Sequence, residues 1–161
     1  MGFFCFIKLF SLSKSEGILH ALEKTGGVLS SCDVTHFNDN PNVTKYTKNS
    51  NRWTFYHGNT NIIFDKINHK YYDLVLHDGS HIGSEVLIDL NNIYPWLKHD
   101  GILLIHDTRH HELGPDMLSA FNSFSKDKDI EYCHLPYGYG LTIIRNKDNI
   151  KNKIELNWKK K

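Results

Sequence analysis

Two short apolar segments of this chain end in the same dipeptide, His-Asp. The first segment ends at His77-Asp78 and the second at His106-Asp107. Apolar runs of this length, bounded by glycine and aspartate, are typical of strands that are buried on both faces of a parallel sheet. Ligands of open α/β sheets bind in the crevice outside the carboxyl ends of the strands. If the two strands are neighbours, the dipeptides therefore converge on one edge of the sheet and mark a candidate site.

The predicted chemistry of this edge is the binding of a divalent metal ion. Asp78 and Asp107 offer carboxylate oxygens and His106 offers an imidazole nitrogen, a set that suits Mg²⁺ or Mn²⁺. A cation held there would lower the pKa of a substrate hydroxyl and orient it. In the alternative interpretation, His106 hydrogen-bonds a neighbouring loop and Asp107 caps the following segment. His77 is expected only to pack.

His81 follows Asp78 at the point where the chain turns toward the next predicted helix. Because imidazole exchanges protons near neutral pH, His81 is the candidate catalytic base for a substrate hydroxyl. The alternative, held equal, is a loop histidine that orients Asp78. His110 and His111 come soon after the second strand and are weaker candidates for the same role.

The elements that position these residues alternate between strand and helix. The sequence predicts strands over residues 3–10, 28–32, 53–56, 72–77, 101–106, 130–134 and 141–145. It predicts helices over residues 15–25, 61–68, 84–97 and 114–125. Residues 35–51 are rich in Asn, Thr and Lys and are expected to form a long loop or a weak helix.

This alternation implies right-handed βαβ units and therefore a mostly parallel, doubly wound α/β sheet. The last two predicted strands are joined by a short glycine-rich turn at residues 136–140. A turn of that length produces a hairpin, so one of these two strands runs antiparallel to the rest of the sheet.

Composition sets broad limits on the class of protein. At 161 residues, the chain is expected to form one domain over residues 1–146, followed by a polar tail at 147–161. A net charge of +1 argues against a nucleic-acid-binding surface. The apolar run at residues 3–10 is too short to span a bilayer, so no membrane association is expected.

Cysteine usage indicates a reducing compartment. The cysteines are odd in number and show no CxxC spacing, so we expect buried, reduced thiols in a cytoplasmic protein. They are Cys5, Cys32 and Cys133.

From residue 72 to residue 145 the sequence resembles the small-molecule O-methyltransferases of the macrocin and cephalosporin-hydroxylase type. In that family a D-G-x-H segment ends the fourth strand, like Asp78–His81 here, and an H-D or E-D pair ends the fifth, like His106-Asp107. The similar stretches are Asp73–His81, Trp96–Thr108 and Leu135–Leu141. The resemblance implies a class I methyltransferase, whose parallel Rossmann-like sheet ends in an antiparallel hairpin and whose methyl donor is S-adenosylmethionine.

The resemblance also implies residues that contact the donor. Asp33, at the end of the second strand, stands where an acid accepts hydrogen bonds from ribose hydroxyls, although a cap or turn is the alternative. Asn59 stands where the family has an acid near the adenine. Asp78 is expected to contact the methyl donor as well as the metal ion. The family's glycine-rich loop after the first strand is replaced by residues 11–17, which contain the single glycine Gly17.

These features favour a metal-assisted, S-adenosylmethionine-dependent O-methyltransferase that acts on a small-molecule hydroxyl. Holding donor and acceptor in near-attack geometry would supply much of the acceleration. One alternative is a catalytically degenerate Rossmann-like remnant that serves as a binding or assembly module. A metal-dependent hydrolase on the same fold is a third hypothesis. A homo-oligomer could complete the acceptor pocket.

Overall fold

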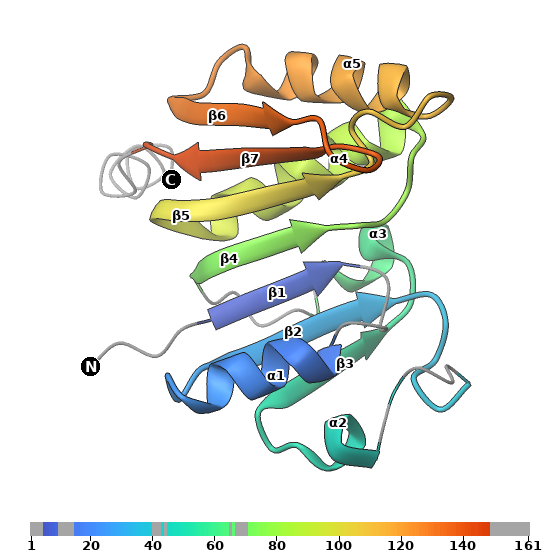
Figure 1. Ribbon diagram of the computed structural model, residues 1–161, viewed down its shortest axis with the longest axis vertical. Helices are drawn as coiled ribbons and strands as arrows, with labels where there is room; N and C mark the ends of the chain where they lie inside the picture. Colours follow the sequence, from blue (N-terminus) through green and yellow to red (C-terminus); the bar gives the residue numbers. More distant parts are fainter. Residues whose placement is uncertain are drawn as a thin grey trace, which may run out of the picture.

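A computed structural model describes residues 5–9, 15–39, 43, 45–64, 66 and 71–148 of the chain. These residues form one seven-stranded sheet in the order β3-β2-β1-β4-β5-β7-β6 (Figure 1). The strands are β1 (Cys5–Leu9), β2 (Val28–Asp33), β3 (Trp53–His57), β4 (Tyr72–His77), β5 (Leu97–His106), β6 (Ile130–Leu135) and β7 (Leu141–Asn146). The helices are α1 (Ser15–Glu23), α2 (Lys45–Asn49), α3 (Thr60–Ile63), α4 (Gly83–Ile93), the 3-10 turn η2 (Tyr94–Trp96) and α5 (Gly114–Ser125).

Strands β1 to β5 are parallel, and β7 is antiparallel to both of its neighbours, β5 and β6. The carboxyl ends of β1 to β5 therefore lie along one side of the sheet, which we call the carboxyl edge (Figure 1). The predicted fold class, a Rossmann-like, mostly parallel sheet with a C-terminal antiparallel hairpin, is confirmed.

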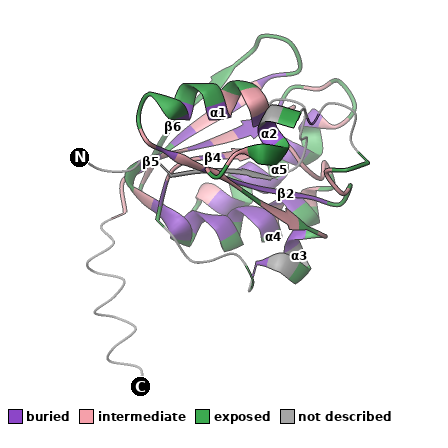
Figure 2. Ribbon diagram, turned by 90° about the horizontal axis from the view of Figure 1, so that it is seen from below, coloured by how far each residue is buried: buried purple, intermediate pink, exposed green. Residues whose placement is uncertain are grey.

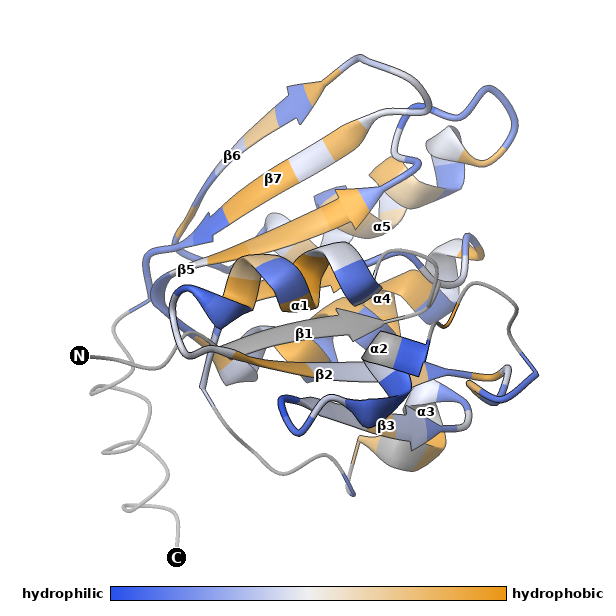
Figure 3. Ribbon diagram, turned by 60° about the horizontal axis from the view of Figure 1, so that its bottom comes forward, coloured by the Kyte–Doolittle hydropathy of each residue, from blue (hydrophilic) through white to orange (hydrophobic). Residues whose placement is uncertain are grey.

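Helices cover both faces of the sheet (Figure 2). On one face α1 packs through Leu19 and Leu22 against Leu29 of β2. On the other face α4 and α5 build the larger core, in which Val86 and Phe121 are fully buried with Val75 of β4. Apolar residues of β4 contact both layers: Val75 lies in the larger core, and Leu74 and Leu76 pack against the smaller cluster under α1. Figure 3 shows that β5 is hydrophobic over most of its length.

Several element boundaries differ from the prediction for a local reason. The predicted helix over residues 84–97 ends at Ile93, because Pro95 lacks the amide hydrogen that a continuing α-helix needs. Leu97 then opens β5, which begins four residues earlier than the predicted strand at 101–106. Within the described residues of the predicted loop or weak helix over 35–51, the one helix is the five-residue α2. Part of the predicted helix at 61–68 and most of the tail at 147–161 lie outside the described residues.

In the part of the chain that the structure describes, no helix combines the length and the hydropathy needed to cross a bilayer. The prediction of buried cysteines is correct for Cys32, which is 1% exposed, and wrong for Cys133. Cys133 lies on β6, an edge strand of the sheet, and its side chain is exposed. The side chain of Cys5 lies outside the described residues.

The two described thiols are expected to differ sharply in reactivity. Burial, followed by the nearby carboxylates of Asp33 and Asp89, raises the pKa of Cys32 to about 12, so this thiol stays protonated at neutral pH. In a Cys5→Ser background, Ellman's reagent should modify one thiol within minutes, and Cys133→Ser should remove that reaction. Modification of Cys32 should require denaturant. Fast reaction of both thiols in the folded protein would contradict the burial of Cys32.

Candidate functional site

The two His-Asp segments meet at the carboxyl edge. Strands β4 and β5 are parallel neighbours, and His77 at the end of β4 pairs with Ile105 of β5. Asp78 and His106 therefore follow at the same level of the sheet. The expectation that the two segments are adjacent in space is confirmed.

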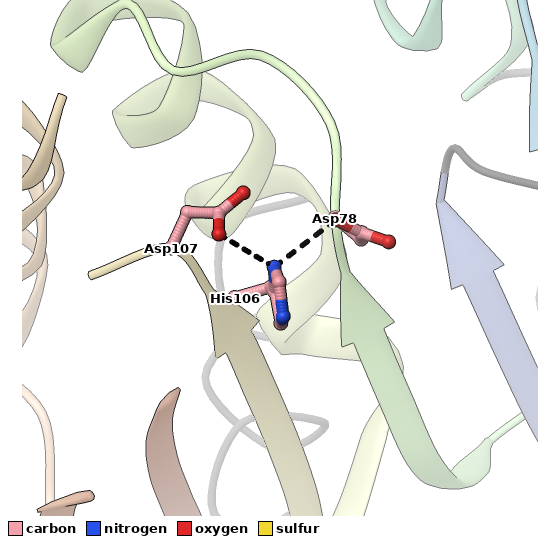
Figure 4. Close-up of side chains that lie close together, drawn as sticks. All are labelled: Asp78, His106 and Asp107. Carbon is pink, nitrogen blue, oxygen red and sulfur yellow. Dashed lines mark ion pairs between the residues drawn. The ribbon is translucent and has the colours of Figure 1, made fainter. Parts of the chain in front are cut away.

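Asp78, His106 and Asp107 form a compact cluster of three possible metal ligands (Figure 4). His106 Nδ1 lies 2.9 Å from Asp107 Oδ1 and 3.4 Å from Asp78 Oδ1, between the two carboxylates. One ligand atom from each residue falls within 4.8 Å of the other two. The structure thus brings together the three residues that the sequence predicts as metal ligands.

Two atoms of this cluster are buried without a hydrogen bond among the described residues. They are His106 Nδ1 and Asp107 Oδ1, which form an ion pair at 2.9 Å but lack hydrogen-bonding geometry. A buried polar atom without a hydrogen bond costs free energy, and such atoms are rare in folded proteins. Two carboxylate oxygens and one imidazole nitrogen are ligands that a small divalent cation accepts. The residues present therefore fit a divalent metal ion.

The backbone at Asp107 adopts a left-handed conformation, with φ of 59°. Side chains other than glycine rarely occupy this region, and aspartate and asparagine tolerate it best. The residues that follow are anchored to the C-terminal hairpin: Arg109 donates its amide to the Tyr139 carbonyl at 2.7 Å. Thr142 of β7 donates a hydroxyl hydrogen bond of 3.0 Å to Thr108. The hairpin thus holds the turn that carries Asp107.

His81 contacts Asp107, at a distance of 2.8 Å between Nε2 and Oδ2. In the alternative interpretation His81 orients Asp78, but the carboxylate that His81 contacts is that of Asp107. The loop after β4 reaches across to the end of β5, where Asp107 lies. Burial acts to raise the pKa of Asp107, but hydrogen bonding from His81 and the proximity of His106 outweigh it. The resulting pKa lies below its ordinary value. Asp107 is therefore a carboxylate at neutral pH and accepts the hydrogen bond from His81 Nε2.

His77 and His106 lie on opposite faces of the sheet. Side chains alternate along a strand, and His106 follows Ile105, which belongs to the core under α4. His77 pairs with Ile105 and lies on that same inner face, fully buried. The expectation that His77 only packs is wrong, because this buried imidazole also contacts the Asp89 carboxylate.

His77 has a partner that the sequence analysis missed. Its Nε2 lies 3.0 Å from Asp89 Oδ2, and Asp89 Oδ1 accepts a 2.7 Å hydrogen bond from Thr60. A signal was present in the sequence: Asp89 comes three residues after Val86 and four before Ile93, so it lies on the apolar face of α4.

The weaker base candidates have other contacts. His110 Nδ1 accepts hydrogen bonds from the amides of Glu112 and Leu113, at 3.3 and 3.4 Å, and so caps a turn. His111 is exposed and stacks on the ring of His110, with the ring centroids 4.5 Å apart. The His110 amide donates to the Asp107 carbonyl at 3.2 Å, but among the described residues neither imidazole hydrogen-bonds a side chain of the metal-ligand cluster.

A family model described as a methyltransferase domain matches residues 15–108, more than half of the chain. The chain belongs to this methyltransferase family. The match covers the end of β2 and both His-Asp segments, and it confirms the predicted class, an S-adenosylmethionine-dependent methyltransferase. A comparison with curated proteins finds no match.

Solved structures share the fold of this methyltransferase domain. An SAH-bound methyltransferase from Podospora anserina aligns with a TM-score of 0.72 at 14% identity, over 89% of this chain and 72% of its own. A putative caffeoyl-CoA O-methyltransferase from Staphylococcus aureus aligns with a TM-score of 0.67 at 13% identity, over 89% of this chain and 76% of its own. MycE of the mycinamycin biosynthetic pathway, in complex with Mg, SAH and mycinamycin VI, aligns with a TM-score of 0.60 at 16% identity, over 89% of this chain and 45% of its own. At these identities the likeness is one of fold.

The predicted donor contacts of the methyltransferase domain lie along the carboxyl edge. Asp33 ends β2 and is buried, and its Oδ1 accepts the Thr35 amide at 2.8 Å, so the turn that was the alternative interpretation is present. Asn59 is exposed and directly precedes α3. Ser15, Glu16 and Gly17 lie inside α1, while residues 11–14 of the same segment are outside the described residues.

Proposed function

We propose that this methyltransferase is a metal-assisted O-methyltransferase that acts on a small-molecule hydroxyl. One observation carries the proposal: His106 Nδ1 and Asp107 Oδ1 are buried beside Asp78 as an ion pair and have no hydrogen bond among the described residues. Such an arrangement costs free energy unless a further group binds there. The structural neighbour MycE, whose structure contains Mg and SAH, supports the same assignment by analogy.

Asp78, His106 and Asp107 would hold Mg²⁺ or Mn²⁺. Such a cation, when bound, lowers the pKa of a neighbouring hydroxyl and orients it. The chain supplies three ligands, two of them on consecutive residues of one turn. The left-handed backbone at Asp107 lets that turn present its carboxylate beside the imidazole of His106.

His81 is the proposed base for the acceptor hydroxyl. Its Nε2 donates a hydrogen bond to the Asp107 carboxylate, which fixes the proton of the neutral ring on Nε2. The described residues give Nδ1 no hydrogen bond, so this nitrogen can accept the proton of the hydroxyl. A base oriented by a carboxylate is a common way to activate an oxygen nucleophile.

S-adenosylmethionine, when bound, carries its methyl group on a sulfonium centre that an oxygen nucleophile can displace. We assign Asp33, Asn59 and Asp78 to its binding because they end or follow parallel strands at the same carboxyl edge as the metal ligands. Asp33 keeps acceptor capacity for ribose hydroxyls, since a carboxylate has about four lone-pair sites and the described turn uses only one oxygen.

Calorimetric titration of the full chain tests this proposal. S-adenosylmethionine alone and MnCl₂ alone should each give saturable heat with a stoichiometry of one. If neither titration gives binding heat, the proposed enzymatic function is rejected and the hypothesis of a catalytically degenerate remnant is retained. Heat with the donor but not with Mn²⁺ or Mg²⁺ would reject the metal assistance and retain methyl transfer.

A further inference from the structure

A buried polar network lies behind the carboxyl edge, and the proposed reaction does not use it. The Asp89 carboxylate, on α4, hydrogen-bonds His77 through Oδ2 at 3.0 Å and Thr60 through Oδ1 at 2.7 Å. His77 is 0% exposed, Asp89 2% and Thr60 3%. The three residues come from three separate elements: the end of β4, the middle of α4 and the start of α3.

Stability alone is a poor explanation for this network. Replacing a buried polar or ionic pair with apolar residues of similar volume is often neutral or stabilising. His77 Nδ1 is also buried without a hydrogen bond among the described residues, which costs further free energy. A carboxylate that accepts hydrogen bonds from two other elements instead fixes the separation and orientation of those elements.

The elements joined in this way carry the candidate site. His77 immediately precedes Asp78, a proposed metal ligand, and Thr60 immediately follows Asn59, a proposed donor contact. The Thr60 hydroxyl also lies 3.4 Å from Asn59 Oδ1. The third element, α4, begins two residues after His81. The Asp89 carboxylate thus links the three segments that hold the proposed ligand, donor contact and base.

We propose that the Thr60–Asp89–His77 network is a positioning network that sets Asp78 against the donor side of the site. The roles of Asn59 and Asp78 rest on the proposed function. The inference that the Thr60 hydroxyl on α3 helps to place the loop after β4 does not depend on the proposed function. Removing the Thr60 hydroxyl should therefore disturb residues 78–81, although Thr60 is not among the proposed metal ligands.

A matched pair of substitutions at Thr60 tests the network. Thr60→Val keeps the shape and removes the hydroxyl, whereas Thr60→Ser keeps the hydroxyl and removes a methyl group. Tyr94→Phe is the control, because it removes a buried hydrogen bond of the same length, 2.7 Å to Asn146, at the amino end of β5. Two readouts are needed on the full chain: backbone ¹⁵N order parameters of residues 78–81, and titration with Mn²⁺ alone.

In Thr60→Val we expect order parameters to fall from about 0.85 toward the flexible range below about 0.6. Mn²⁺ affinity should fall about tenfold, as for the loss of an outer-shell partner of a metal ligand. Thr60→Ser and Tyr94→Phe should resemble the wild type in both readouts. Equal effects of Val and Ser, or unchanged order parameters in Thr60→Val, would overturn the proposal. Wild-type protein that binds no Mn²⁺ while the order parameters respond as expected would retain the positioning network and reject the proposed metal site.

Discussion

Replacing Asp107 with asparagine is expected to abolish Mn²⁺ binding and to lower kcat/KM by about 1,000-fold, which corresponds to about 4 kcal/mol of transition-state stabilisation. The substitution removes the charge of a proposed ligand atom that lies 2.9 Å from His106 Nδ1. It also weakens the acceptor that orients His81. This loss of kcat/KM should be larger than the roughly 10- to 100-fold loss of metal affinity or activity that follows removal of an outer-shell partner.

Asparagine is the informative replacement because of the backbone. At φ of 59° an alanine side chain would be strained, whereas asparagine adopts this conformation as readily as aspartate. The free energy of unfolding should therefore change by less than about 1 kcal/mol in Asp107→Asn, within the usual range for a point substitution. An Asp107→Ala variant would combine strain with loss of the ligand and could not separate the two effects.

The chain offers a matched control in Asp100. Among the described residues it is the other aspartate with a positive φ, 62°, and it lies near the amino end of β5, away from the carboxyl edge. Asp100→Asn should leave Mn²⁺ affinity and kcat/KM within about twofold, since the ion pairs that it removes, with His99, Arg145 and Lys147, are exposed. Isothermal titration with Mn²⁺ and thermal unfolding of both variants give the comparison. Normal Mn²⁺ affinity in Asp107→Asn would remove Asp107 from the metal site.

The second large effect is expected at His81. Glutamine can still donate a hydrogen bond to Asp107 but cannot accept a proton, so His81→Gln should lower kcat by about 100- to 1,000-fold, the contribution typical of general base catalysis. Mn²⁺ affinity and donor affinity should stay within about threefold, because His81 is not one of the proposed ligands.

His110→Gln is the matched control for this prediction. His110 also follows a strand that ends in a His-Asp pair, but its Nδ1 already accepts two backbone amides. Its replacement should change kcat by less than about threefold and leave the pH profile intact. Steady-state kinetics from pH 5 to 9 on both variants decide between the two histidines. A large loss in His110→Gln together with a small one in His81→Gln would reverse the assignment of the base.

Much of the architecture could be predicted because local patterns determine it. The apolar runs at β4 and β5 predict buried parallel strands, and the glycine-rich turn at 136–140 predicts the terminal hairpin. The predicted ligands Asp78, His106 and Asp107 come together because the carboxyl ends of neighbouring parallel strands share one edge. The boundary between α4 and β5 was less predictable, since Leu97 continues the apolar face of the helix beyond Pro95.

Other features depend on contacts that no local pattern contains. The partner of His81 is Asp107, 26 residues away, because the loop after β4 crosses to the end of β5. Asp89 meets Thr60 and His77 because α4 packs across the sheet beside α3. Exposure of Cys133 follows from the position of β6 at the edge of the sheet, which depends on the order of the strands.

The sequence by itself determined which residues end the strands, and hence which ligands a metal ion could find at the carboxyl edge. Only the tertiary structure decided how the two His-Asp pairs divide their roles. The register pairs His77 with Ile105, so His106 falls one residue further along and on the opposite face. Alternation along each strand can be read from the sequence, whereas the register between two strands is fixed by the packing of both of their faces. For that reason one histidine turns inward to Asp89 and the other joins the two carboxylates.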